Sequence, residues 1–163
     1  MPQRLERVMK KLTMVLVTLG GIAAFATIAS SAEDLAAAVK ERRDLMKKTV
    51  APSAKLGGQM VKGAAPFDAD KAEAAMTDIS NVPDKYVTLF PKGTAHGEIE
   101  DSEAKADVWT DFDKFKEIAQ KLKDASAKAA GAAKQGKGSF TAAFNDMTKI
   151  CKECHEDFRE KIE

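Results

Sequence analysis

Apolar residues recur at helical spacing through the C-terminal half of the chain. Between Val108 and Leu122 they lie three or four residues apart, which is the heptad pattern of a packed helix. The same pattern returns at Phe140, Phe144, Met147, Cys151, Cys154, Phe158 and Ile162. Both cysteines of the chain therefore lie in the apolar stripe of the last predicted helix.

The first predicted helix has a charged residue in its apolar stripe. The stripe consists of Leu35, Val39, Arg42, Met46 and Val50. Arg42 needs a partner there, because a buried charge is costly unless it is paired or hydrogen-bonded. Pro52 should kink or interrupt the helix, since proline has no N–H to donate, and we expect the helix to resume through Met60.

A weaker stripe, Ala72, Met76 and Ile79, predicts the remaining helix. Asp68 or Asp70 is a candidate for its N-cap. Glycine-containing segments at residues 62–66 and 131–138 separate the helices. Together these elements predict an all-α fold, an antiparallel up-down four-helix bundle.

The longest connection is residues 83–106, between the second and third predicted helices. We expect Tyr86, Leu89 and Phe90 to pack on the bundle, and the stretch from Gly93 to Glu103 to stay solvated.

The N-terminal segment has the pattern of an export signal. Arg4, Arg7, Lys10 and Lys11 precede an uncharged apolar run, and the small residues Ser30-Ser31-Ala32 follow it. The run is short for a membrane span of roughly 20 residues, which disfavours an uncleaved N-terminal anchor. We therefore predict a cleaved signal peptide at residues 1–32, a bundle domain at residues 33–163, and a periplasmic location.

Charge excludes one class of partner. The whole chain has 26 basic and 25 acidic residues. The signal segment contains four of the basic residues and one acidic residue, Glu6, so the mature chain has 22 basic and 24 acidic residues and a net charge of −2. Nucleic-acid binding would need a clear basic excess, so we expect none.

The last helix contains Cys151-Lys152-Glu153-Cys154-His155, the Cys-x-x-Cys-His spacing of a c-type haem site. Two cysteines three positions apart share one helix face, so both sulfurs can reach the edge of one porphyrin. His155 follows directly as the proximal iron ligand. We predict one covalently bound haem, haem c.

Two other uses of the cysteines are weaker. A thiol redox enzyme with a Cys-x-x-Cys pair normally carries it where a helix follows a strand, and no strand is predicted here. A zinc site needs four ligands, and the whole chain has only two cysteines and two histidines.

The chain resembles the class II c-type cytochromes, the family that includes the cytochromes c-prime. The resemblance rests on the haem motif near the C-terminus and on four segments that precede it in the same order: Arg42-x-x-x-Met46-Lys47, residues 62–69, residues 89–94, and Val108-Trp109-x-x-Phe112-x-x-Phe115. It covers essentially the whole mature chain and implies the same bundle fold. The surrounding segments look closer to the low-spin, Met-ligated branch of the family.

The resemblance places Met46 on the distal side of the haem, where some members use a methionine as axial iron ligand and others only fill the pocket. His96 is the other candidate for the sixth position, but it lies in the polar loop Thr94-Ala95-His96-Gly97. We expect Met46 to bind the iron. Met60, Met76 and Met147 are expected to be core fillers.

Arg42 and Arg159 are candidates for the haem propionates, because guanidinium offers two parallel donors to a carboxylate. The resemblance places Arg159 beside the proximal histidine. The cluster Lys40, Arg42, Arg43, Lys47 and Lys48 would suit docking of an acidic redox partner, although charged runs on helices are usually only solvated faces.

These observations predict a periplasmic electron carrier that serves redox partner proteins and is not an enzyme. The alternative is a five-coordinate, cytochrome c-prime-type protein that binds nitric oxide or carbon monoxide, in which Met46 covers the iron without binding it. The resemblance also raises a homodimer through the first two helices.

Overall fold

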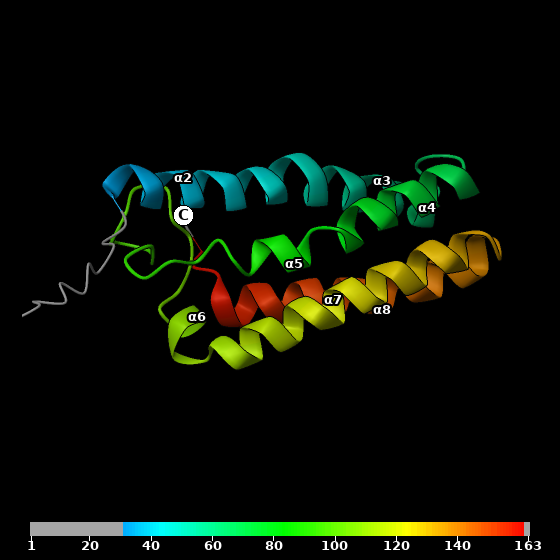
Figure 1. The fold of residues 1–163 in the computed structure, drawn as a ribbon. Coiled ribbons are helices and arrows are strands. Elements are labelled where there is room, and N and C mark those ends of the chain that lie inside the picture. Colours follow the sequence, from blue (N-terminus) through cyan, green and yellow to red (C-terminus); the bar gives the residue numbers. More distant parts are fainter. Residues whose placement is uncertain (1–30, 162–163) are drawn as a thin grey trace, which may run out of the picture.

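The computed structural model describes residues 31–161, which form a helical bundle (Figure 1). Its first rod consists of α2 (Ala32–Asp44), the π-helix η1 (Leu45–Val50) and α3 (Ala51–Lys62). The predicted signal segment lies outside the described residues except for Ser31 and Ala32, which are the N-cap and the first residue of α2.

Three further long helices complete the bundle. α4 (Ala69–Ser80) runs back along the first rod, and α7 (Phe112–Ala133) and α8 (Lys137–Phe158) form a second antiparallel pair. The short helices α5 (Pro83–Tyr86) and α6 (Asp107–Thr110) lie in the connection between the two pairs. The predicted all-α bundle is confirmed.

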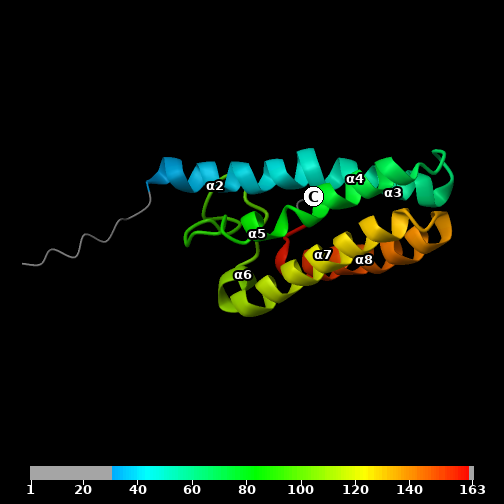
Figure 2. The same ribbon diagram turned by 45° about the vertical axis from the view of Figure 1, so that its right-hand side comes forward.

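The bundle is wider at one end than at the other. Both views show the rods close together where α3 meets α4 and α7 meets α8, and spread apart toward α2 and α6 (Figures 1 and 2). The long connection between α5 and α6 lies at the wide end. Among the described residues, no helix combines the length and the apolar character that crossing a bilayer requires.

Local sequence explains where the helices begin and end. The Asp68 carboxylate accepts a hydrogen bond from the Lys71 amide at 3.0 Å, so Asp68 rather than Asp70 caps α4. Gly63 ends α3 with a φ of 75°, a conformation that costs glycine little. The break between α7 and α8 is shorter than predicted, because Gly131 and Gly138 both lie inside helices.

Pro52 interrupts the first helix by changing its winding. The residue has no N–H for the carbonyl of Lys48, and the turns just before it are wound as a π-helix in which the Ala51 N–H bonds to the Met46 carbonyl, five residues earlier. The chain then continues as α3 to Lys62, two residues beyond the predicted Met60.

The core has two parts. The larger lies between α3, α4, α7 and α8 and contains Met60, Met76 and Met147, which confirms their assignment as core fillers. The smaller is aromatic and lies at the wide end, where the Phe115 ring centroid is 4.8 Å from that of Phe90 and 5.2 Å from that of Phe158.

The prediction that residues 93–103 stay solvated is wrong in part. Thr94 is fully buried and Ser102 is 2% exposed. The physical reason is Arg42, whose buried guanidinium takes its acceptors from this segment and draws the segment into the bundle.

Candidate haem-attachment site

A cavity of about 410 Å³ lies at the wide end of the bundle, between the first rod and α8. Cys151, Cys154 and His155 line it from α8, and Met46 lines it from η1. Another part of the wall comes from the aromatic cluster and the long connection, through Tyr86, Phe90, Glu103, Ala104, Val108 and Phe115. The structure thus brings the predicted haem motif and the predicted distal residue into one cavity.

The two cysteines are half-buried on one face of α8 and do not form a disulfide with each other. Burial raises the pKa of Cys151, and burial together with the charge of Cys151 raises the pKa of Cys154 to about 12. Both groups are therefore protonated at neutral pH. Because the thiolate is the reactive form in thiol–disulfide exchange, this environment disfavours the thiol redox enzyme.

His155 lies at the edge of the cavity, with part of the residue exposed to solvent. Burial lowers its pKa, the charge of Arg159 lowers it further, and Glu103 opposes both effects. The imidazole is thus kept neutral, which is the form that binds a metal.

Of the two candidates for the sixth position, only Met46 lies in the cavity. Met46 is half-buried on η1, with Arg42 and Val50 beside it on the cavity wall. His96 lines a separate surface depression, and its Nδ1 lies 2.9 Å from the Ser102 carbonyl oxygen.

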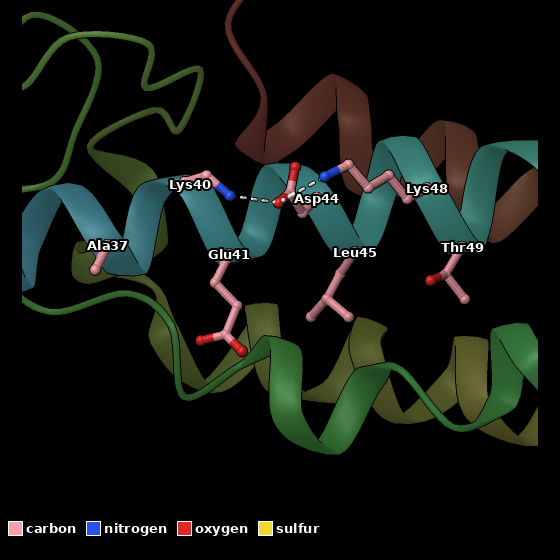
Figure 3. A pocket seen from close by; sticks show the side chains of 7 residues that line it. All are labelled: Ala37, Lys40, Glu41, Asp44, Leu45, Lys48 and Thr49. Carbon is pink, nitrogen blue, oxygen red and sulfur yellow. Dashed lines mark hydrogen bonds and ion pairs between the residues drawn. The ribbon is translucent and has the colours of Figure 1, made fainter.

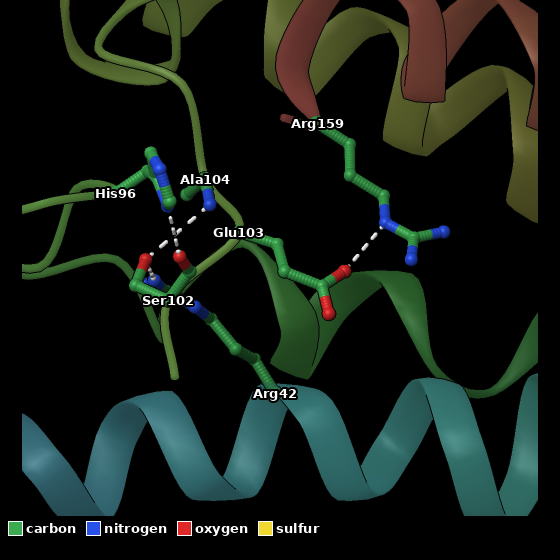
Figure 4. Close-up of polar contacts among 6 residues, drawn as sticks. All are labelled: Arg42, His96, Ser102, Glu103, Ala104 and Arg159. Carbon is green, nitrogen blue, oxygen red and sulfur yellow. Dashed lines mark hydrogen bonds and ion pairs between the residues drawn. The ribbon is translucent and has the colours of Figure 1, made fainter. Parts of the chain in front are cut away.

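Arg42 is 3% exposed and has neutral hydrogen-bond partners (Figure 4). Its terminal nitrogens donate to the Leu89 carbonyl at 3.1 Å, the Thr94 hydroxyl at 3.0 Å, the Thr94 carbonyl at 2.6 Å and the Ser102 hydroxyl at 2.7 Å. The guanidinium carbon also lies 4.4 Å from the centre of the Phe90 ring. Burial lowers its pKa. Within residues 31–161 no carboxylate pairs with this cation, so an anion in the cavity would compensate it.

Two more arginines line the cavity. Arg159 donates from Nε to the Glu103 carboxylate at 2.6 Å. Arg43 forms an ion pair with Asp101, while its Nε is buried without a hydrogen-bond partner. Sequence reasoning placed Arg43 only in a surface cluster and did not single out Glu103. Adjacency to Arg42 was a signal for Arg43, whereas the position of Glu103 depends on the loop conformation.

These residues fit a haem. Cys151 and Cys154 could attach its vinyl groups, His155 could bind its iron, and Tyr86, Phe90 and Phe115 could pack on its ring, with Met46 on the wall of the same cavity. The unpartnered Arg43 Nε supplies a donor for its carboxylates, and the buried Arg42, whose terminal N–H groups are already bonded to neutral acceptors, supplies a compensating positive charge.

The structure separates the basic cluster seen in the sequence. Lys40 and Lys48 both form ion pairs with Asp44, at 2.8 and 3.0 Å (Figure 3). These three residues line a groove along the first rod, and none of the predicted site residues lines it. Arg42 is buried and Arg43 faces the cavity, as does Lys47. The five cations therefore do not form one continuous docking patch.

The family model of cytochrome c prime matches residues 37–159. The chain belongs to this family. The cofactor of a cytochrome c prime is one covalently bound haem c, and the chain has the two cysteines that attachment requires.

Relatives in this family cover most of the length of this chain. Cytochrome c-554 of Cereibacter sphaeroides is 34% identical over 86% of this chain and 92% of its own, and cytochrome c' of the same organism is 32% identical over 91% and 97%. A solved nitric oxide complex of a mutant cytochrome c prime from Alcaligenes xylosoxidans is 29% identical, covers 78% of this chain and 97% of its own, and has a TM-score of 0.67. The likeness to this solved structure confirms the four-helix bundle.

Proposed function

We propose that this protein transfers single electrons through a haem bound to Cys151 and Cys154, with His155 and Met46 as the axial iron ligands. The observation that carries the proposal is that Met46, from η1, lines the same cavity as His155, from α8. Two strong ligands favour a low-spin iron that changes little between its oxidation states, which suits electron transfer.

The haem supplies the one-electron couple, and the chain supplies its environment. The aromatic side chains around Phe115 give the cavity an apolar wall, while Arg42 and Arg43 offer positive charge to the haem carboxylates. Arg42 also holds the long connection in place against the cavity.

Nitric oxide binding is the second candidate function. It is favoured by the cytochrome c prime from Alcaligenes xylosoxidans that was solved as a nitric oxide complex. In this case Met46 covers the iron without binding it, and its flexible side chain gives way to the ligand. Carbon monoxide would enter by the same route.

The cellular setting of this function is part of the proposal. The basic, apolar and small-residue segments of residues 1–32 favour export to the periplasm. The partners would be redox proteins, with no substrate turnover by this chain. A homodimer through the first rod and α4 is compatible with these roles.

The deciding experiment is the visible spectrum of the purified ferric and dithionite-reduced protein, each with and without carbon monoxide. A sharp low-spin reduced spectrum, a weak far-red ferric sulfur-to-iron band and little response to carbon monoxide would support electron transfer with Met46 bound. A broad high-spin spectrum that shifts strongly with carbon monoxide would overturn the Met46 ligation and favour gas binding.

A further inference from the structure

Ser102, Glu103 and Ala104 form a strap that connects the first rod to the end of α8 along the cavity wall (Figure 4). At its first residue, the Ser102 hydroxyl accepts a hydrogen bond from Arg42 at 2.7 Å and donates to the Thr94 carbonyl at 2.7 Å. Ser102 is almost completely buried, so this attachment is protected from water.

The other end of the strap is bound to the segment that follows His155. The Glu103 carboxylate accepts from Arg159 Nε at 2.6 Å, and the Glu103 carbonyl accepts from the Glu160 amide at 2.7 Å. The Lys105 amide donates to the Phe158 carbonyl at 3.0 Å. Side-chain and backbone contacts together fix the Glu103 carboxylate beside the Arg159 guanidinium.

The position of this ion pair matters more than its strength. The side chains of Glu103 and Arg159 are 23% and 52% exposed, and an ion pair this accessible to water contributes little to stability. Both residues nevertheless line the same cavity as His155, and the Arg159 amide donates to the His155 carbonyl at 3.3 Å, one helical turn away. The pair therefore places two opposite charges beside the proposed iron ligand.

We infer that Glu103 is a positioning residue, which holds the Arg159 guanidinium at the proximal side of the haem and cancels its charge there. Arg42 binds the strap from the first rod, so one loop links the helix that contains Met46 to the segment that follows His155. The inference rests on the proposed ligation of iron by His155 and is independent of what occupies the sixth position.

The test is the reduction midpoint of haem-loaded variants at pH 7 and constant ionic strength. Glu103→Gln leaves the Arg159 charge uncompensated, which favours the ferrous state because that state has one positive charge less. The ferrous-to-ferric ratio at a fixed solution potential should rise by roughly threefold to tenfold, and tenfold corresponds to about 59 mV for one electron. Arg159→Gln should lower the ratio, and the double variant should lie between the two single variants.

Two further variants separate positioning from folding. Glu103→Asp keeps the charge on a shorter side chain, so it should shift the midpoint less than Glu103→Gln does. Glu73→Gln removes the carboxylate of a similar exposed pair, Glu73 with Lys134 at 2.7 Å, at the opposite end of the bundle, and should leave the midpoint unchanged.

A haem-loaded Glu103→Gln variant with the midpoint of the wild type would overturn the inference, even if its melting temperature fell. So would a midpoint that moves in the same direction as that of Arg159→Gln. Failure of the underlying haem assignment is distinguishable, because it would show in the wild type as a protein without covalent haem.

Discussion

Met46 differs from the core methionines in its surroundings. Met60, Met76 and Met147 are closed off from solvent among other apolar side chains, whereas Met46 is half-buried and lines the cavity. A methionine in this position presents its thioether to whatever fills the cavity, and a thioether is an established haem ligand. The contrast favours a role for Met46 at the iron.

Met46→Ala should convert the iron to high spin and open it to carbon monoxide. If Met46 occupies the iron in about 99% of molecules, its removal raises the apparent carbon monoxide affinity roughly a hundredfold. The measurement is a carbon monoxide titration of the reduced protein, followed by its visible spectrum. Met46→Leu is the control, because it keeps most of the bulk without the sulfur and should also give a high-spin spectrum. A Met46→Ala variant that matches the wild type in spectrum and affinity would show that Met46 is not the ligand.

Gly57 permits α3 to pack closely on α8. A Cβ atom at Gly57 would lie 2.6 Å from Cε2 of Phe144, whose ring is held in the core beside Phe140. Gly57→Ala should therefore destabilise the haem-loaded protein by roughly 1–3 kcal/mol through overpacking.

Gly58→Ala is the matched control on the same helix. Its Cβ would make an ordinary contact of 3.8 Å with the same ring, so alanine should stabilise the helix by about 0.5–1 kcal/mol. Urea unfolding followed by circular dichroism measures both changes. Equal stabilities for the two variants would contradict the close approach of the helices.

At the scale of elements, the π-helix η1 sets the direction of Met46. A π-helical turn contains an extra residue, and such turns are frequent at functional sites. Pro52 is the second residue of α3, just after η1, and has no N–H for the hydrogen bond that an α-helical turn would need. The angle about the helix axis between the side of the rod that carries Arg42 and Met46 and the side of α3 that packs on the core therefore depends on this proline.

Pro52→Ala should allow residues 45–50 to return to α-helical winding. Loss of the extra residue would rotate Met46 by about 100° relative to α3, since each helical residue turns by that angle. We expect a weaker far-red ferric band and a stronger response to carbon monoxide, with the melting temperature maintained.

Pro66→Ala is the matched control, because Pro66 lies outside the helices in the turn between α3 and α4. It should leave the spectrum unchanged. If Pro52→Ala also kept the wild-type spectrum, the proline would not determine the direction of Met46.

For the whole molecule, the haem is part of the core. An unfilled cavity of about 410 Å³ would cost up to roughly 10 kcal/mol at about 24 cal/mol per Å³, an upper bound because the cavity opens to solvent. This approaches the entire stability of a typical domain, about 5–15 kcal/mol. The wide end of the bundle therefore depends on its cofactor.

A Cys151→Ser/Cys154→Ser variant purified without haem should lose cooperative packing at the wide end. Expected signs are a weakened near-ultraviolet circular dichroism signal and binding of the dye ANS, with much of the helical signal retained. Thermal unfolding should begin well below that of the haem-loaded protein, because a ligand that binds only the native state stabilises it. A sharp transition at the melting temperature of the haem-loaded protein would contradict this prediction.

The sequence by itself determined the helices and the attachment motif. Helical periodicity, the cap at Asp68 and the break at Gly63 are local properties that a short segment specifies through its own backbone and side chains. The spacing of Cys151, Cys154 and His155 is local in the same sense, and the stripe that contains Met46 followed from its neighbours alone.

Only the tertiary structure decided which distant residues meet. Arg42 takes its acceptors from Leu89, Thr94 and Ser102, which are 47, 52 and 60 positions away, and Glu103 meets Arg159 across 56 positions. The helical periodicity of the sequence cannot predict such contacts. They form because the buried Arg42 needs hydrogen-bond acceptors and the long connection provides them. For that reason the loop predicted to be solvated became a wall of the haem cavity.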